Sequence, residues 1–398
     1  MKKYTFYLVG LVVLALSSCN KNKLYYPADF YQGTMQTCID KNNIYVDIHR
    51  TFPHINTNSI FYYDNFPAEH LIEYNFATNK MDTLFSPKSS NFSPAHYPSD
   101  FYIVNRDSIL ISTMYMYYWS NTYKWNIAKP EYKDLSLWKI NNYIDDSVYH
   151  YCIGRFSGSL MNIIDGKYLV TPVVKNGLRS DTTDQRYARW GETYDELKDW
   201  NRNHYIRINM IEDSILDVKL FCSGDWVPSH RQDIYFNRGY MDNFYSTKKE
   251  RFYFFTEYTM EIAVADKEGN FIKSVTPESQ FFTGFSPFPK EDLYSQTKMS
   301  KYAESKLWLS ELKYDEYRNV FLRVITSPSR VSEDGMQRVN GDFVVMVLDE
   351  DLNKKYEVYF ERKNYTGSIH ITEKGVYLLK TDTDESNRYY KADRFIFD

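Results

Sequence analysis

The sequence predicts an all-β protein, a six-bladed β-propeller with four-stranded antiparallel blades. Three observations lead to this prediction: the chain is rich in aromatic residues, its apolar residues alternate over short runs, and a pair of hairpins recurs along it. Of the 398 residues, 38 are Tyr, 26 are Phe and 7 are Trp, against 15 Gly and 13 Pro. This composition excludes a disordered or collagen-like chain, and Tyr and Phe favour the half-buried surface of a sheet.

The first 18 residues have the features of a bacterial lipoprotein signal peptide. Lys2 and Lys3 precede an apolar run over 4–16, which is shorter than the roughly 20 residues that a membrane span needs. The sequence Leu-Ser-Ser-Cys at 16–19 resembles the lipobox, in which the peptide is cut before a Cys that becomes acylated. Several acyl chains on Cys19 would form a stable anchor. The alternative is an ordinary secreted protein in which Cys19 stands there by chance.

We therefore expect a lipoprotein signal peptide at 1–18, a lipidated Cys19 with a tether over 19–33, and a propeller domain over 34–398. Asn20 replaces the Asp that resembles an inner-membrane retention signal, so we expect an outer-membrane lipoprotein of the cell envelope. Lys21 and Lys23 stand where surface-displayed lipoproteins carry acidic residues, which leaves open the face of the outer membrane.

Three further cysteines remain after Cys19, and none is needed as a staple in an exported protein of this size. Cys152 and Cys222 lie in apolar, strand-like runs, which favours buried free thiols. A bond between Cys152 and Cys222 stays open, because the sequence does not test its geometry.

A repeated unit determines the predicted architecture. A polar turn followed by a β-rich run occurs six times, and its strands are marked by Ile60, Ile109, Tyr168, Phe252, Val320 and Val376. A second unit, of two alternating strands joined by a polar turn, follows each of these at 70–85, 134–153, 204–221, 261–275 and 343–360. The sixth copy, at 388–398, stops after one strand. Two hairpins repeated six times indicate six four-stranded sheets arranged radially.

The missing strand of the last blade suggests how the ring closes. A β-like run, Asn43–His49, stands at the start of the folded region without a partner. If this run pairs with the C-terminal blade, the ring closes and no exposed edge is left. Two stacked β-sandwiches with similar hairpins are the competing architecture.

An aromatic insertion over 115–138 is the candidate binding surface. Tyr118, Trp119, Tyr123 and Trp125 alternate there with Asn and Lys residues. Flat rings can stack on the faces of sugars while polar neighbours bond the hydroxyls. The alternative is that these rings fill the gap between neighbouring blades.

The search for catalytic motifs returns negatives. The sequence contains no His-Glu-x-x-His, Cys-x-x-Cys, Walker or Gly-x-Ser-x-Gly motif, and its eight His are scattered singly. The run Asp-Thr-Asp-Glu-Ser at 382–386 lacks the Gly of a calcium loop. We therefore expect no catalytic residues, no cofactor and no metal. The near balance of 48 Lys and Arg against 52 Asp and Glu also excludes a nucleic-acid partner.

The Cys19 lipobox, the six hairpin pairs and the run Tyr-Asp-Glu-Tyr-Arg-Asn-Val-Phe-Leu-Arg at 314–323 together resemble an uncharacterised family of Gram-negative lipoproteins. The function of that family is unknown, and it is related to six-bladed β-propellers. The resemblance covers roughly 45–398 and implies a fold and an envelope location, but it supplies no catalytic residues.

The leading functional hypothesis is a lipid-anchored propeller that binds a ligand or a partner protein at the envelope without catalysis. Its partners would be the membrane, through Cys19, and a glycan or an outer-membrane protein. The alternative is a glycan-active hydrolase or lyase whose acidic residues converge on the central channel. A third hypothesis is a scaffold subunit of an outer-membrane complex.

The anchor makes the first testable prediction. Cells that produce the wild-type protein should incorporate a radioactive fatty acid into it, because the Cys19 thiol and the new amino group both become acylated. The measurement is the label that comigrates with the purified protein. An unlabelled wild-type protein would contradict the lipoprotein hypothesis.

Overall fold

The computed structural model describes the following parts of the chain: 24–40, 49–50, 52, 54–64, 70–85, 97–115, 119–126, 131–134, 149–153, 161–178, 204–209, 218–222, 241–256, 260–281, 295, 297–298, 301, 308–328, 330–331, 338–339, 341–381 and 389–398. The predicted signal peptide and Cys19 lie outside these residues. The chain divides into two compact units. Unit 1 takes its residues from 1–36, 275–285 and 304–398, and unit 2 from 37–274 and 286–303.

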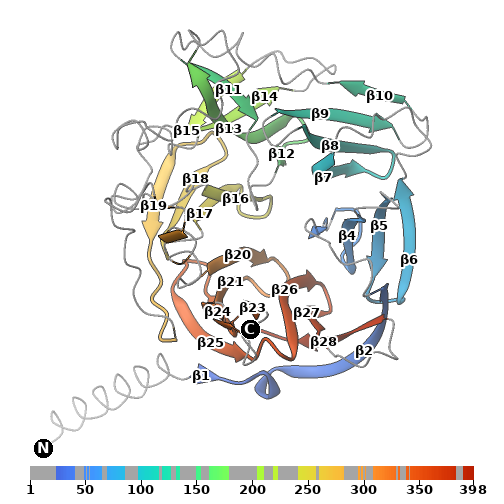
Figure 1. The fold of residues 1–398 in the computed structure, drawn as a ribbon, viewed down its shortest axis with the longest axis vertical. Coiled ribbons are helices and arrows are strands. Elements are labelled where there is room, and N and C mark those ends of the chain that lie inside the picture. The colour runs from blue at the N-terminus through green and yellow to red at the C-terminus, as the bar shows by residue number, and fades with distance from the viewer. Residues whose placement is uncertain are drawn as a thin grey trace, which may run out of the picture. The chain divides into compact units, whose positions relative to one another are not determined.

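Unit 2 contains four sheets whose strands follow one another in chain order (Figure 1). The first sheet has the order β3 (His49–Arg50), β4 (Ser59–Asp64), β5 (His70–Asn75) and β6 (Lys80–Phe85). The second has β7 (Tyr97–Asn105), β8 (Ser108–Tyr115), β9 (Trp119–Asn126) and β10 (Glu131–Asp134). The third has β11 (Tyr149–Ile153) and β12 (Asn162–Ile164), both beside β13 (Tyr168–Leu178), then β14 (His204–Asn209) and β15 (Val218–Cys222). The fourth has β16 (Met241–Ser246), β17 (Arg251–Thr256), β18 (Ile262–Asp266) and β19 (Phe271–Val275).

Unit 1 contains the remaining sheets. The fifth has the order β20 (Trp308–Asp315), β21 (Val320–Thr326), β24 (Phe343–Leu348), β25 (Lys354–Phe360) and β1 (Leu24–Tyr25). The sixth has β26 (Tyr365–Thr372), β27 (Gly375–Lys380), β28 (Tyr389–Phe395) and β2 (Tyr31–Asp40). A short ribbon joins β22 (Arg330–Val331) to β23 (Arg338–Val339), and a 3-10 helix, η2, covers Pro27–Asp29.

The described fold is all-β and propeller-like, because antiparallel sheets of four strands follow one another along the chain. Each of the six sequence markers falls in the second strand of a different sheet, namely β4, β8, β13, β17, β21 and β27. Each copy of the repeat predicted from the sequence therefore corresponds to one sheet.

The strand beside the C-terminal strand β28 is β2, Tyr31–Asp40, and not Asn43–His49 as predicted. Residues 43–48 lie outside the described residues, and His49 belongs to β3, where it pairs with Tyr62. The Thr34 hydroxyl donates a hydrogen bond to Asp393 of β28, and the Tyr31 ring lies 6.2 Å from that of Phe395. The prediction failed because β2 contains many polar residues, which conceal its alternation.

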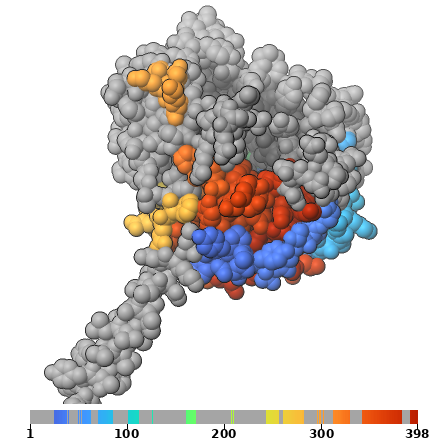
Figure 2. Space-filling model, turned by 60° about the horizontal axis from the view of Figure 1, so that its bottom comes forward, coloured from blue at the N-terminus to red at the C-terminus, as the bar shows by residue number. Residues whose placement is uncertain are grey.

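Residues 24–33, assigned to the tether from the sequence, hold β1, η2 and the start of β2. β1 pairs in parallel with β25 through Leu24 with Glu357 and Tyr25 with Val358. Figure 2 shows this N-terminal segment, in blue, lying over the strands of unit 1, in red. Folded structure thus begins by Leu24, since the aromatic residues of the segment find partners on unit 1.

The aromatic insertion over 115–138 proves to be largely strand, because β9 and β10 complete the second sheet within it. The run 134–153 was predicted to supply those two strands, but its C-terminal part is β11, which pairs with β13 in the third sheet. Aromatic residues at 119, 123 and 125 have the two-residue period of a strand. That period was the signal that the sequence analysis missed.

The strand order also decides the cysteine question. Cys152 lies in β11 and Cys222 in β15, and β13 and β14 separate these two strands. Neighbouring strands lie about 4.8 Å apart, so the two Cα atoms are separated by roughly 14 Å, twice the reach of a disulfide. A bond between Cys152 and Cys222 does not fit this sheet.

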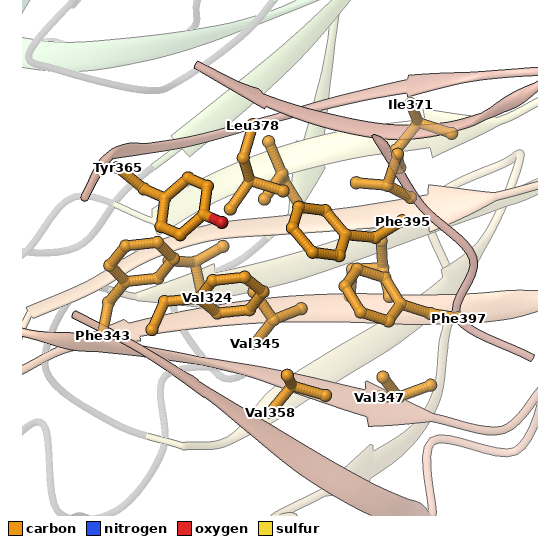
Figure 3. Packing of buried hydrophobic residues seen from close by; sticks show 14 of the residues in the cluster. Val324, Phe343, Val345, Val347, Val358, Tyr365, Ile371, Leu378, Phe395 and Phe397 are labelled. Carbon is orange, nitrogen blue, oxygen red and sulfur yellow. The ribbon is translucent and has the colours of Figure 1, made fainter. Parts of the chain in front are cut away.

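The core of unit 1 lies between the fifth and sixth sheets (Figure 3). The fifth sheet contributes Val324, Phe343, Val345, Val347 and Val358 and the sixth contributes Tyr365, Ile371, Leu378 and Phe395, with Phe397 beyond the last strand. The rings of Phe343 and Phe360 stack at 5.1 Å, and Phe395 meets Phe360 edge-on at 5.4 Å. Every residue of β24 is buried, on both faces of the strand. The middle of this sheet is therefore covered on two sides.

Unit 2 repeats this arrangement with two shared cores. One core joins the first and second sheets through Phe52, Phe61, Leu71, Phe101, Ile103, Ile109 and Ile111. The other joins the third and fourth sheets through Ile164, Val170, Phe252, Phe254, Ala263 and Ala265. In each case consecutive sheets bury one another's apolar faces, which is the main source of their stability.

Arg50 links three sheets of unit 2 at its inner strands. Its guanidinium donates a hydrogen bond to the carbonyl of Phe101 in β7 at 2.9 Å and another to that of Met161, beside β12, at 3.0 Å. The ring of Tyr102 lies 5.9 Å from the guanidinium carbon. Burial lowers the pKa of Arg50 to about 9. A buried cation held by two carbonyls fixes the relative register of these strands.

The substitution Arg50→Met should lower the free energy of unfolding by about 2 kcal/mol, because two buried carbonyls lose their charged donor. Chemical denaturation of the purified protein measures the change. Arg106→Met is the matched control: the Arg106 side chain is 62% exposed, and its ion pair with Glu73 spans 3.7 Å. Because the Arg106 cation is exposed and Glu73 keeps its hydrogen bonds from Asn56 and Ser59, the loss of this long pair should cost less than about 1 kcal/mol. Equal losses in the two variants would contradict the linking role of Arg50.

Candidate functional site

The first strands of the two sheets in unit 1, β20 and β26, are both irregular at the same end. In β20 the register with β21 shifts between Leu309 and Glu311, and in β26 the register with β27 shifts between Tyr365 and Ile369. Such bulges occur often next to functional sites, where they redirect a side chain. We therefore built the candidate site from the charged residues at these two bulges.

Three charged side chains, Glu311, Lys313 and Arg362, form the candidate site. The Lys313 ammonium lies 3.0 Å from a carboxylate oxygen of Glu311 and donates a 2.7 Å hydrogen bond to the carbonyl of Ile369. Burial lowers the pKa of Arg362, and the negative charge of Glu311 acts against that shift. Lys313 therefore pairs with Glu311, and the charge of the same carboxylate acts on Arg362. Lys313 also joins β20 to β26.

Gly367 makes room for Arg362. A Cβ atom at this position would lie 1.9 Å from a guanidinium nitrogen of Arg362, and the backbone has a φ of +88°, which favours glycine. Asp342 holds the loop on the other side, since its carboxylate accepts a hydrogen bond from the Arg362 backbone N–H at 3.0 Å. The guanidinium carbon lies 6.0 Å from the centre of the Phe343 ring. The chain thus positions Arg362 against the bulge of β26.

The composition of this site suits the binding of polar groups. Glu311, whose side chain is 19% exposed, is paired with an ammonium. Asp342 accepts hydrogen bonds from the Arg362 backbone N–H and from the Tyr359 hydroxyl. Two cations and one anion can hold the polar or anionic groups of a ligand by charge-assisted hydrogen bonds.

The motif at 314–323 that carried the family resemblance has a structural role at the opposite end of the strands. Asp315 accepts hydrogen bonds from the backbone N–H groups of Tyr317 and Arg318, and its carboxylate lies 2.6 Å from the Arg318 guanidinium. Arg318 also donates to the carbonyls of Thr372 and Glu373, in the next sheet. Burial raises the pKa of Asp315, while the bond with Arg318 acts against the rise. This motif fastens the two sheets of unit 1 together.

The other buried carboxylates of the described residues also hold chain segments in place. Glu73 accepts hydrogen bonds from the Asn56 amide and the Ser59 hydroxyl. Glu357 accepts from the backbone N–H of Gln280 at 3.0 Å, and Asp393 accepts from the Tyr365 hydroxyl at 2.8 Å. Within the described ranges, no group of three His, Cys, Asp or Glu side chains could hold a metal ion.

The structure distributes the residues predicted from the sequence as follows. Trp119, Tyr123 and Trp125 lie in β9, where the register places Tyr123 opposite Ile111 and Trp125 opposite Ile109. Tyr118 and Cys19 lie outside the described residues. The role of the four aromatic residues in ligand binding stays a prediction, as does the acylation of Cys19.

The sequence analysis missed Glu311, Lys313 and Arg362. The bulged pairing of β20 and the turn before β26 bring them together, and neither is visible in a sequence pattern. The one available signal was Gly367, a glycine inside a strand-like run, which often marks a bulge or a close approach of another group.

Comparisons with known proteins show similarity without an activity. The family model described as "Domain of unknown function (DUF4221)" matches residues 239–357. A structure of a member of that family from Bacteroides vulgatus ATCC 8482 has a TM-score of 0.64 and 14% identity, and the match covers 92% of this chain and 96% of that one. At this identity the likeness shows the fold alone. No curated protein matches the sequence.

Two other solved structures are similar at lower scores. One is a putative exported protein from Bacteroides fragilis NCTC 9343, with a TM-score of 0.47, 10% identity and coverage of 95% of this chain and 98% of that one. The other is regucalcin, a calcium-binding protein from Agrobacterium tumefaciens C58, with a TM-score of 0.43, 10% identity and coverage of 94% and 96%. Across the described residues, no helix is long and apolar enough to cross a membrane.

The close approach of Arg362 to Gly367 predicts that Gly367→Ala will be costly. The positive φ alone should cost about 1 kcal/mol, and displacement of the partly buried Arg362 guanidinium should add to this cost. Gly166→Ala is the matched control, because Gly166 has a φ of +63° but no atom within 4 Å of an added Cβ. Denaturation curves of the two variants give the comparison. A loss in Gly367→Ala no larger than in Gly166→Ala would show that Arg362 is not fixed at this position.

Proposed function

We propose that this chain is a lipid-anchored protein of the bacterial cell envelope that binds a ligand or a partner protein without catalysing a reaction. Its anchor is Cys19, acylated after removal of the signal peptide at 1–18, and the outer membrane is its location. Its six sheets of four or more strands form a closed six-bladed propeller, with β2 as the outer strand of the last blade. The match over 239–357 supports membership of the DUF4221 family.

The observation that supports binding is the composition of the site formed by Glu311, Lys313 and Arg362. Lys313 and Arg362 bring two positive charges to the bulges of β20 and β26, where Glu311 pairs with Lys313 and its charge also acts on Arg362, so the site offers charged hydrogen-bond donors. Such a site suits a ligand rich in hydroxyl or anionic groups, such as an envelope glycan, or a polar segment of an outer-membrane protein.

A glycan-array and pull-down screen of the soluble Lys21–Asp398 fragment tests this function. For a glycan that binds, Arg362→Ala should weaken the affinity about tenfold, which corresponds to the loss of one charge-assisted hydrogen bond. Lys363→Ala is the matched control, because this neighbouring side chain is 74% exposed and pairs only at the surface with Glu361. The dissociation constant of each variant is the measurement.

Two outcomes would contradict the proposal. Equal affinity of the Arg362→Ala and Lys363→Ala variants would place the binding surface elsewhere. Release of a shortened glycan during incubation with the wild-type fragment would favour the glycan-active enzyme instead.

A further inference from the structure

Exposed aromatic side chains gather where the chain enters unit 1. The side chain of Tyr26 is 59% exposed and that of Phe281 is 38% exposed, which is unusual for rings of this size. Both rings contact Tyr359 of β25, Tyr26 edge-on at 6.4 Å and Phe281 tilted at 4.8 Å. We call these three residues, Tyr26, Phe281 and Tyr359, the aromatic rim.

Hydrogen bonds hold the Tyr359 ring and the backbone that carries the other two rings of the aromatic rim. The Tyr359 hydroxyl donates to a carboxylate oxygen of Asp342 at 2.6 Å. The backbone N–H of Phe281 donates to the Ser279 hydroxyl at 3.2 Å. The backbone N–H of Tyr26 donates to Asp29 at 3.2 Å, directly after the pairing of β1 with β25. The Tyr359 ring is therefore held at its hydroxyl, and the backbone at Tyr26 and Phe281 is held beside it, which reduces the ordering that a covering surface must impose.

The distance along the chain from Cys19 to the rim is short. Four residues lie between Cys19 and Leu24, the first residue of β1, so five Cα–Cα steps separate these two residues. Fully extended, they span about 17 Å, which is less than the thickness of one leaflet with its headgroups. An acylated Cys19 would therefore hold the aromatic rim next to the headgroup layer.

The chemistry of the rim and of the short connection suits that layer. Tyr is enriched at the boundary between water and membrane, where its ring lies among apolar groups and its hydroxyl meets water. Lys21 and Lys23, in the connection, add two positive charges that attract anionic headgroups. A partner protein could also cover aromatic side chains, but the length of the connection selects the membrane.

We propose that the aromatic rim of Tyr26, Phe281 and Tyr359 rests on the headgroup layer of the membrane that holds acylated Cys19. The anchor then does more than tether the protein, because it sets the orientation of unit 1, with β1 and the neighbouring strand β25 toward the lipid. This inference rests on the proposed anchor at Cys19. It goes beyond that anchor by assigning a second, non-covalent membrane contact.

Hydroxyl-radical footprinting of the full acylated protein tests the contact. The protein is inserted into vesicles of phosphatidylethanolamine and phosphatidylglycerol and is compared with the same protein in detergent. Oxidation of Tyr26 and Phe281 should fall several-fold on vesicles, while that of Met81, a reference side chain that is 43% exposed, should stay the same. Equal oxidation of the rim in vesicles and detergent would overturn the membrane contact. So would equal protection of Met81, since that would show a general loss of labelling.

A pair of variants separates a membrane contact from a structural role. The double variant Tyr26→Ser with Phe281→Ser should remain in the membrane through its acyl chains, but hydrogen exchange of residues 275–281 should rise on vesicles to the rate seen in detergent. Phe271→Ser, which removes a ring that is 50% exposed outside the rim, should leave the protection intact. If residues 275–281 of the double variant exchange on vesicles at the same rate as those of the wild type, the rim does not meet the lipid.

The mass of the N-terminal peptide keeps the two proposals distinguishable. An acylated protein whose rim stays unprotected would refute the membrane contact and leave the anchor standing. A protein without acyl chains would refute the anchor and, with it, the inference built upon it. Protection that appears in native membranes but not in the lipid vesicles would identify a protein as the occupant and overturn the lipid contact.

Discussion

The structure depends on the need of each sheet to have its apolar faces covered by another part of the chain. All six residues of β24 are buried, and so are the first six of β21, which means that the middle strands of the fifth sheet have no solvent face. An isolated sheet with this sequence would expose both of its apolar faces. Three described cores are each shared by two consecutive sheets, so each of these sheets is covered in part by its neighbour. The abundance of Phe and Tyr follows from this requirement.

Side-chain bonds to backbone carbonyls supplement the apolar cores at the inner strands. In unit 2, Arg50 bonds to the carbonyls of Phe101 and Met161. In unit 1, Lys313 bonds to that of Ile369 while Arg318 bonds to those of Thr372 and Glu373. A cation buried in this way costs desolvation, and only well-placed acceptors offset that cost. Lys313 joins β20 to β26 and also places its positive charge at the candidate site. One residue therefore contributes both to the packing and to the chemistry of the site.

Much of the fold could be predicted because strands carry a local signal. The markers from Ile60 to Val376 lie in polar-turn-and-strand patterns that need no knowledge of distant partners, and all six fall in strands of separate sheets. The strand beside β28 could not be identified in this way. Tyr31–Asp40 contains Gln, Thr and Gly at many positions, and only its pairing with a strand more than 350 residues away explains it. The density of aromatic residues around Trp119 suggested an insertion, although their two-residue period indicates a strand.

The candidate site was beyond prediction for a related reason. Glu311 and Lys313 alternate on one strand like many charged pairs, and Arg362 follows a different strand by two residues. Pairing between sheets and the bulge at Gly367 place these residues together. Local sequence patterns do not predict such contacts between distant residues. The sequence analysis therefore identified the architecture more fully than the chemistry.

Scanning calorimetry of the Lys21–Asp398 fragment tests the central claim most directly. If the consecutive sheets form the closed ring that we propose, no part of the ring can unfold without exposing the faces of its neighbours. The account then predicts a single transition in which the calorimetric and van't Hoff enthalpies agree. Two resolved transitions, one for each compact unit, would contradict a closed ring whose sheets depend on one another.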